Sequence, residues 1–209
     1  MIPILRPYLI GITGGSASGK TTVGKAIKDN CDKECLIVNL DNFFKQLTPE
    51  LANQSKLGNY NVDIPEAIDY QLLIEVLTNL LNNKEVKIPI YDFKEANRTN
   101  EFIICQPKPI IILEGLHVLY WKELRDLIDL KIFVLTDDDL RLSRRITRDV
   151  NERGQNLKGI LEFYEKFVKN SYEKYIKPCM KSADLIIPWN VENKHAIKLI
   201  TSALKSNAK

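Results

Sequence analysis

The sequence predicts an α/β fold with a mainly parallel sheet and helices on both faces. Short apolar runs alternate with helical patterns along the whole chain, which is typical of a parallel sheet. A glycine-rich segment, 14–21, separates the first apolar run from the first helical pattern. That order of strand, glycine-rich loop and helix predicts a P-loop NTPase-type fold.

Each element is assigned from its apolar spacing and its bounding turn residues. We expect strands over 8–13, 35–40, 109–113, 130–135 and 184–187, and helices over 20–29, 65–81, 138–151, 157–176 and 194–204. Residues 45–63 are polar and turn-rich. No linker or internal repeat divides the chain, so we expect a single domain over 1–209.

Two further segments are expected as additions to the sheet. Residues 86–91 and 100–105 form short β patterns around a polar bend, which predicts an inserted β-hairpin at about 86–105. Pro89 argues against a central strand there. The arginine-rich stretch at about 141–160 predicts a helical lid.

Composition excludes several classes of protein. A hydrophobic fraction of 44% and a charged fraction of 27% are ordinary globular values, and a net charge of +3 gives no basis for nucleic-acid binding. No apolar run is long enough to span a membrane and no leader segment stands at the start, so we expect no membrane partner and a cytoplasmic location. The four cysteines lack metal spacing and are expected to be free thiols.

The glycine-rich segment satisfies the pattern G-x-x-x-x-G-K-[ST]. In this pattern backbone N–H groups wrap phosphates, the lysine neutralises their charge and the hydroxyl offers an oxygen to Mg²⁺. The residues expected to bind the phosphates are Gly14, Gly15, Ser16, Ala17, Ser18, Gly19, Lys20, Thr21 and Thr22.

Two carboxylates follow predicted strands directly, at the edge where ligands of open α/β sheets collect. Glu114 ends the most apolar strand and is expected to hold Mg²⁺ with Thr21. Asp41 is expected to orient a hydroxyl acceptor and take its proton, with Phe44 in the pocket wall.

Five arginines occur within thirteen residues: Arg141, Arg144, Arg145, Arg148 and Arg153. Their spacing of three to five places several on one helical face, where guanidinium groups can neutralise a transferred phosphoryl group. The alternative is a solvated helix paired with neighbouring acids. Neither His117 nor His195 is expected to act directly, and of the aromatic stripe over 163–175 only Phe163 is expected to touch substrate.

The whole chain from about 8 to 204 resembles the uridine kinase, or uridine/cytidine kinase, family. Beyond the phosphate loop, the similar segments are 39–44, 60–67, 88–93, 113–115 and 141–154. The resemblance implies ATP- or GTP-dependent phosphorylation of a pyrimidine nucleoside on its 5′-hydroxyl, in pyrimidine salvage. It also implies a homo-oligomer, a tetramer.

The resemblance assigns roles to individual residues. Asp41 matches the general base, with Lys20 on the phosphates. The ribose-binding pair is matched by Asp63 and Arg145, and the base-pocket wall by Tyr91 and Phe93. The nucleotide phosphates are matched by the lid residues Arg148 and Arg153, and the magnesium shell by Thr21 and Glu114, with Asp41 beside it.

The sequence departs from the family pattern near the base. Ala96 stands where the family usually has a base-reading histidine. In addition, Phe44 replaces a tyrosine, Gln155 a lid arginine and Phe163 a common glutamine. Because each change removes a donor or acceptor, we expect weakened or altered base selectivity.

Two other readings stay open at this point. A related P-loop kinase with another acceptor, such as another nucleoside, nicotinamide riboside or ribulose phosphate, shares the phosphate loop and the acidic residue after the second strand. A catalytically silent nucleotide-binding protein is the other. A GTPase is disfavoured because Asn193-Lys194-His195-Ala196 lacks the aspartate that reads guanine.

Overall fold

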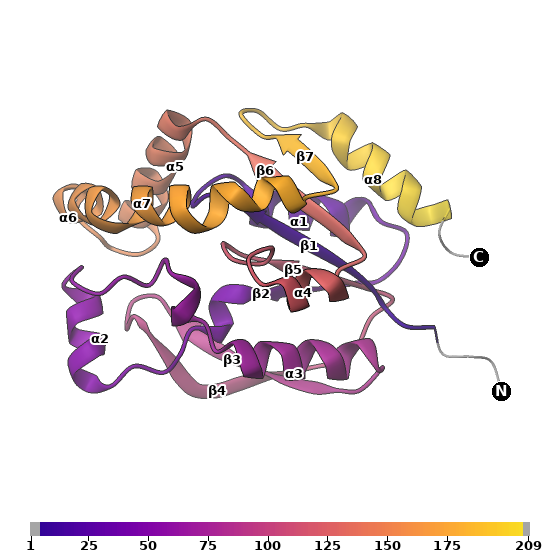
Figure 1. Ribbon diagram of the computed structural model, residues 1–209, viewed down its shortest axis with the longest axis horizontal. Helices are drawn as coiled ribbons and strands as arrows, with labels where there is room; N and C mark the ends of the chain where they lie inside the picture. Colours follow the sequence, from indigo (N-terminus) through magenta and orange to yellow (C-terminus); the bar gives the residue numbers. More distant parts are fainter. Residues whose placement is uncertain (1–4, 207–209) are drawn as a thin grey trace.

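A five-stranded parallel sheet lies at the centre of the computed structural model, which describes residues 5–206 (Figure 1). Residues 1–4, which belong to the segment where we expected no leader, lie outside that range. The strands are β1 (Tyr8–Gly14), β2 (Cys35–Asn39), β5 (Ile110–Glu114), β6 (Leu130–Leu135) and β7 (Leu185–Pro188), in the order β2-β5-β1-β6-β7. Every neighbouring pair is parallel, so all carboxyl ends meet at one edge. The predicted α/β fold is confirmed.

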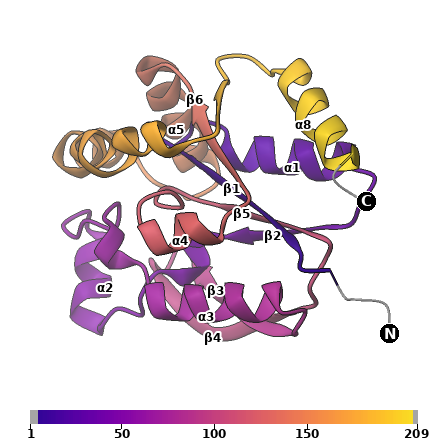
Figure 2. The same cartoon turned by 45° about the vertical axis from the view of Figure 1, so that its right-hand side comes forward.

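Helices cover both faces of the sheet, as the two views show (Figures 1 and 2). On one face, α1 (Lys20–Asn30) and α8 (Lys194–Ser206) pack Ile27 and Ile200 against the strand residues Ile12 and Ile112. On the other face lie α3 (Tyr70–Leu81) and the short α4 (Lys122–Leu127). Alternate strand residues point to opposite faces, which is why nearly continuous apolar runs are needed here.

The inserted hairpin forms a separate antiparallel sheet of β3 (Val86–Asp92) and β4 (Asn97–Cys105). Val86 and Ile88 are buried and belong to the same core as α3. Pro89 therefore lies in a two-stranded ribbon, where a missing N–H is tolerated. The second strand begins at Asn97, three residues before the expected position.

The helix expected over 65–81 is interrupted. Pro65–Ala67 is a 3₁₀ turn, and Ile68 is extended because it forms a β-bridge with Phe44. Helix α3 then starts at Tyr70, capped by the Asp69 side chain, which accepts a hydrogen bond from the Leu72 N–H at 3.3 Å. A tertiary contact therefore divides a segment whose spacing alone predicted one helix.

The turn-rich segment 45–63 contains a helix that we did not predict. Helix α2 (Pro49–Lys56) starts after Thr48, whose hydroxyl accepts from the Leu51 N–H at 3.4 Å. It has no buried residue, so no apolar stripe marked it in the sequence. The N-cap threonine followed by proline was the available signal. The short α4 was also not predicted.

The lid region consists of α5 (Asp138–Asn151), a turn, and α6 (Leu157–Phe163). The expected helix over 157–176 continues as π-helical Tyr164–Val168, α7 (Lys169–Ser171) and π-helical Tyr172–Ile176, and ends in 3₁₀-helical Lys177–Ser182. All four cysteines are free thiols. Within 5–206, no helix is both long and apolar enough to cross a membrane.

Candidate active site

The loop between β1 and α1 has a backbone shape that depends on glycine. Gly14 has a φ of 153° and Gly19 a φ of 99°. A Cβ at Gly14 would lie 2.5 Å from the carbonyl oxygen of Val134, and one at Gly19 would overlap the indole ring of Trp189. Helix α1 has no side-chain cap, so its first N–H groups have no side-chain partner. This loop and helix start are suited to binding phosphate.

The nine residues predicted to bind the phosphates have two roles. Ser16, Ala17, Lys20, Thr21 and Thr22 line a cavity of about 1100 Å³. The other four, Gly14, Gly15, Ser18 and Gly19, shape the loop behind that surface.

The Lys20 side chain lies against the phosphate loop. Its side chain is buried, and Nζ donates to the carbonyl oxygen of Gly15 at 2.9 Å. Burial lowers the pKa of Lys20, while the negative charges of Glu114 and Asp41 oppose that shift. Among the described residues the ammonium has no carboxylate hydrogen-bond partner, so it is available to an anion in the cavity.

Glu114 and Asp41 come from neighbouring strands, as their positions predicted. Asn39 pairs with Glu114 between β2 and β5, and the Asn39 side chain accepts from the Asp41 N–H at 2.8 Å. The Thr21 hydroxyl donates to Glu114 Oε1 at 2.8 Å. Burial raises the pKa of both carboxyls, and the Lys20 charge opposes the shift in each.

Three oxygen-bearing residues of this cavity suit a hard cation: Thr21, Glu114 and Asp41. Among residues 5–206, no cluster of three or more His, Cys, Asp or Glu side chains has the arrangement of a complete metal cage. The donor set fits Mg²⁺, because this ion commonly takes one or two carboxylates and completes its shell with phosphates and water.

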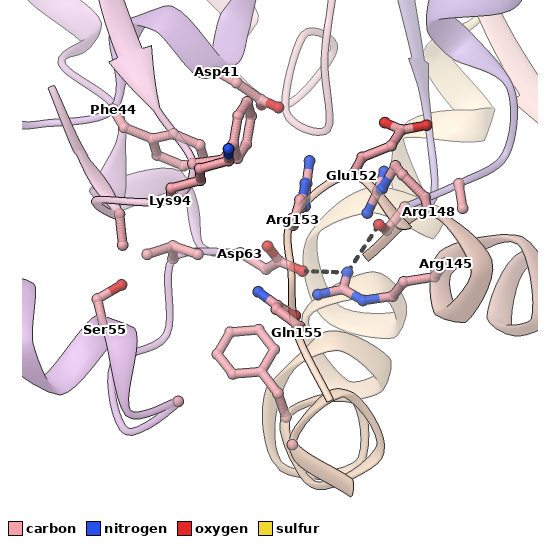
Figure 3. Close-up of a pocket in the computed structure, with 18 of the residues that line it drawn as sticks. Asp41, Phe44, Ser55, Asp63, Lys94, Arg145, Arg148, Glu152, Arg153 and Gln155 are labelled. Carbon is pink, nitrogen blue, oxygen red and sulfur yellow. Dashed lines mark hydrogen bonds and ion pairs between the residues drawn. The ribbon is translucent and has the colours of Figure 1, made fainter. Parts of the chain in front are cut away.

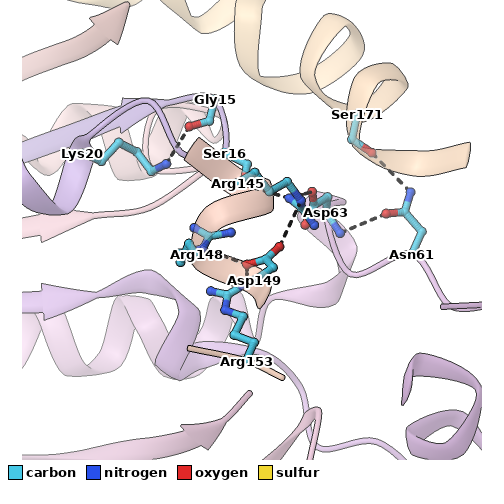
Figure 4. Close-up of polar contacts among 10 residues, drawn as sticks. All are labelled: Gly15, Ser16, Lys20, Asn61, Asp63, Arg145, Arg148, Asp149, Arg153 and Ser171. Carbon is cyan, nitrogen blue, oxygen red and sulfur yellow. Dashed lines mark hydrogen bonds and ion pairs between the residues drawn. The ribbon is translucent and has the colours of Figure 1, made fainter. Parts of the chain in front are cut away.

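The lid arginines are gathered by one buried carboxylate, that of Asp149 (Figure 4). Its oxygens lie 3.3 Å from Arg145 Nε, 2.8 Å from Arg148 Nε and 3.2 Å from Arg153 Nη1. The Asp149 side chain is 1% exposed. All three arginines line the cavity, so the buried Asp149 holds three of its positively charged side chains in place.

The other two arginines of the cluster, Arg141 and Arg144, stabilise the fold. Arg141 is buried, pairs with Asp138 at 2.6 Å and stacks 3.9 Å above the ring of Tyr172. Arg144 donates to the carbonyl oxygens of Trp189 and Asn190. The alternative of a helix paired with neighbouring acids is right about the pairing, because Asp138 and Asp149 pair with these arginines, but Arg141 and Arg145 are buried and not solvated.

Arg145 connects the phosphate loop with the predicted ribose carboxylate (Figure 4). Its Nη1 donates to Ser16 Oγ at 2.8 Å and lies 3.8 Å from Asp63 Oδ2. Asp63 is fixed in turn by Asn61, whose Oδ1 accepts from the Asp63 N–H at 3.0 Å. The Asn61 Nδ2 donates to Ser171 Oγ at 3.2 Å, which ties this loop to α7.

Aromatic rings form one wall of the cavity. The ring centroids of Phe44 and Tyr91 are 4.9 Å apart, and those of Tyr91 and Phe93 are 5.1 Å apart. Burial raises the pKa of Tyr91 to about 12, so its hydroxyl stays protonated at neutral pH. Arg153 lies 4.1 Å from the Phe93 ring centroid, so the lid already contacts the hairpin. Phe163 lines the cavity and lies 5.7 Å from the Arg145 guanidinium.

His117 is buried but does not line the cavity. It is 1% exposed, its ring contacts Tyr120, Trp121 and Tyr175, and neither nitrogen has a hydrogen bond of good geometry with a residue of 5–206. Burial lowers its pKa to about 3, although the adjacent Asp63 backbone favours the charged form. His195 is exposed at the start of α8.

Several residues of the site were not predicted. Asp149 appeared in the sequence only as a neighbour of arginines, although its spacing of four from both Arg145 and Arg153 was a signal. The end of α2 and the loop after it also line the cavity, through residues 55–59. So does Lys94 of the hairpin turn (Figure 3). Ala96 and Gln155, which the family resemblance put near the base and in the lid, also line the cavity.

The comparisons with known proteins concern the chain as a whole. Residues 9–196 match the model of the phosphoribulokinase / uridine kinase family. Uridine-cytidine kinase 2-B from Danio rerio is 39% identical, over 97% of this chain and 80% of that one. Uridine-cytidine kinase B from Dictyostelium discoideum is 43% identical, over 96% of this chain and 82% of that one.

Among solved structures, the fold is similar to that of phosphoribulokinase from Rhodobacter spheroides. The TM-score is 0.64 at 16% identity, and the match covers 88% of this chain and 70% of that one. At this identity the likeness concerns the fold alone.

Proposed function

Because the chain belongs to the phosphoribulokinase / uridine kinase family, we propose that it is a nucleoside kinase that phosphorylates uridine or cytidine on the 5′-hydroxyl. ATP or GTP is the proposed phosphate donor. The observation that carries this proposal is the position of Asp41. Its carboxyl lines one cavity with the phosphate loop and with Asp63, Arg145 and the aromatic wall.

Some of these residues position the substrates and others stabilise charge, which is how phosphoryl transfer is catalysed in general. Asp63 and Arg145 bind the ribose hydroxyls and so place the 5′-hydroxyl at Asp41. Asp41 accepts the proton of that hydroxyl as the new bond to the γ-phosphorus forms and the bond from the γ-phosphorus to the bridging oxygen breaks, so that ADP leaves. Lys20, Arg148 and Arg153 bind the phosphates and offset the charge that develops on them.

Thr21, Glu114 and Asp41 would hold Mg²⁺, which polarises the β- and γ-phosphates when bound. The proposal is supported by the hydrogen bond that Thr21 donates to Glu114, which orients the two side chains toward each other. The three residues lie on the phosphate side of the cavity.

Base selectivity is proposed to be weaker than in a pocket built on several hydrogen bonds. Ala96 presents only a methyl group to the cavity, Phe163 presents an apolar ring, and Phe44 has no hydroxyl. Discrimination by shape and stacking is typically far smaller than discrimination by hydrogen bonding.

Further proposals follow from the family resemblance. We propose that the enzyme works in pyrimidine salvage in the cytoplasm, as one domain over 1–209 with the lid at about 141–160. A homo-oligomer, a tetramer, is proposed as its assembly.

The proposed function is tested by incubating the protein with ATP, Mg²⁺ and a panel of nucleosides. We expect ADP and a nucleoside 5′-monophosphate in equal amounts, identified by mass spectrometry, with uridine or cytidine. Turnover of nicotinamide riboside or ribulose phosphate alone would favour the related kinase. If no acceptor gives ADP while ATP still binds, the catalytically silent reading holds instead.

A further inference from the structure

The turn of the β3–β4 hairpin places Lys94 at the aromatic side of the cavity. Asp92 Oδ1 accepts from the N–H groups of Lys94 and Glu95, at 2.7 and 3.2 Å, which fixes the turn. Ala96 follows with a φ of 50°. In Figure 3 the Lys94 side chain extends into the cavity beside Phe44.

Lys94 differs from the other lysines at this end of the cavity, because they already have partners. Lys56 pairs with Glu95 at 2.6 Å, Lys158 with Glu162 at 3.8 Å, and Lys166 donates to Asn59 at 3.1 Å. The Lys94 side chain has no hydrogen bond or ion pair with any residue of 5–206. Among the described residues it is therefore a lysine of this cavity whose ammonium is not taken up by a neighbouring side chain.

The apolar residues on this side of the cavity cannot distinguish two bases of similar shape. Phe44, Phe93 and Ala96 offer apolar surface, which stacks on any planar base. An ammonium group differs from these because it carries three hydrogen-bond donors and no acceptor. It therefore favours a base that turns a carbonyl oxygen toward it and disfavours one that turns an amino group toward it.

Uracil and cytosine differ in this respect at two neighbouring ring positions: N3, which donates in uracil and accepts in cytosine, and C4. Uracil has a carbonyl oxygen at C4, an acceptor, whereas cytosine has an amino group there, a donor. We propose that Lys94 is a specificity-determining residue that selects uracil nucleosides over cytosine nucleosides by donating to this oxygen. The inference rests on the proposed function. Because the Lys94 side chain is exposed to water, the preference is about tenfold, far below that of a buried hydrogen-bonded pocket.

The test compares kcat/KM for uridine and cytidine in the wild type and in Lys94→Met. Uridine is expected to be preferred about tenfold by the wild type, and the ratio is expected to fall to near one in Lys94→Met, mainly through a loss with uridine. Lys94→Arg keeps the donors and is expected to keep the preference. The matched control is Lys87→Met on the same hairpin, where the ammonium lies over the Phe102 ring and does not line the cavity.

Three results would overturn the inference. They are a wild-type ratio near one or below, an unchanged ratio in Lys94→Met, and an equal loss with both nucleosides in that variant. If the wild type phosphorylates both nucleosides in any of these cases, the proposed function stands and only the role of Lys94 falls. If it phosphorylates neither, both fall.

Discussion

The carboxylate of Asp149 lies 3.3 Å from Nε of Arg145, and both side chains are almost fully buried. Asp149 also pairs with Arg148 and Arg153, so one negative charge holds three cationic groups of the cavity. The position of these arginines therefore depends on a residue that does not itself line the cavity. Replacing Asp149 therefore tests how the arginines are positioned without removing a side chain that would contact the phosphates.

We predict that Asp149→Asn lowers both stability and activity. Removing one partner of a buried ion pair leaves an uncompensated charge, and we expect a loss of about 3 kcal/mol in the free energy of unfolding. Because the arginines lose their common partner, kcat/KM for ATP is expected to fall at least about tenfold. Urea denaturation and steady-state kinetics measure the two effects.

Asp139→Asn is the matched control for this variant. Asp139 is exposed in the first turn of the same helix and has no pairing among the described residues. Its replacement is expected to cost less than about 1 kcal/mol, the size of a helix-dipole effect. Equal behaviour of the two variants would contradict the role given to Asp149.

The pH dependence of kcat/KM reports on Asp41. Burial raises its pKa above the ordinary value of 3.8, and Lys20 and Arg153 oppose the shift. A general base must be ionised, so activity is expected to fall as the pH is lowered, with an acid-side midpoint above 3.8. Initial rates at low nucleoside concentration measure this midpoint. A midpoint at or below 3.8 would disagree with the buried position of Asp41.

His117 is predicted to destabilise the protein in acid. Its pKa is about 3 in the folded state against 6.5 when unperturbed, so between these values the unfolded chain binds more protons. The contribution of His117 is therefore fully present above pH 6.5 and is lost as the pH falls toward 3. We expect the stability of the wild type to fall relative to His117→Leu over this window.

Chemical denaturation of both proteins at several pH values measures this difference. Comparing the two proteins cancels the titration of Asp41 and Glu114, which both retain. A difference that stays constant with pH would mean that the imidazole is not held neutral.

Ala96→His is predicted to sharpen base selectivity. It restores the residue that the uridine kinase family usually has at this place, and histidine tolerates the φ of 50° better than most side chains. The ratio of kcat/KM for uridine to that for a purine nucleoside is expected to rise at least about tenfold. An unchanged ratio would show that this position does not face the base.

Parts of the site could be predicted because they are encoded by adjacent residues. The phosphate loop is one continuous segment, and Asp41 and Glu114 are placed by the ends of their strands. Asp149 was missed because its role depends on the turn after α5, which brings Arg153 back to it. The sequence also could not predict that the Lys94 side chain is unpaired among the described residues, because this depends on which of the neighbouring lysines find partners.

The same distinction applies to the fold. Strong apolar patterns gave the strands of the central sheet and helix α5 with nearly correct bounds. The break before α3 arises from the bridge between Phe44 and Ile68, which are 24 positions apart, and no local pattern contains it. Helix α2 has only exposed and half-buried side chains, so its cap was its main signal.

The most direct measurement is nucleoside-dependent ADP formation by the wild type and by Asp41→Asn, with ATP, Mg²⁺ and uridine. The wild type is expected to form ADP only when the nucleoside is present. Asp41→Asn is expected to lower kcat at least about a hundredfold, the low end of a general-base contribution, and to keep its affinity for ATP. ADP formation that ignores the nucleoside, or an unchanged kcat in the variant, would contradict a kinase mechanism centred on Asp41.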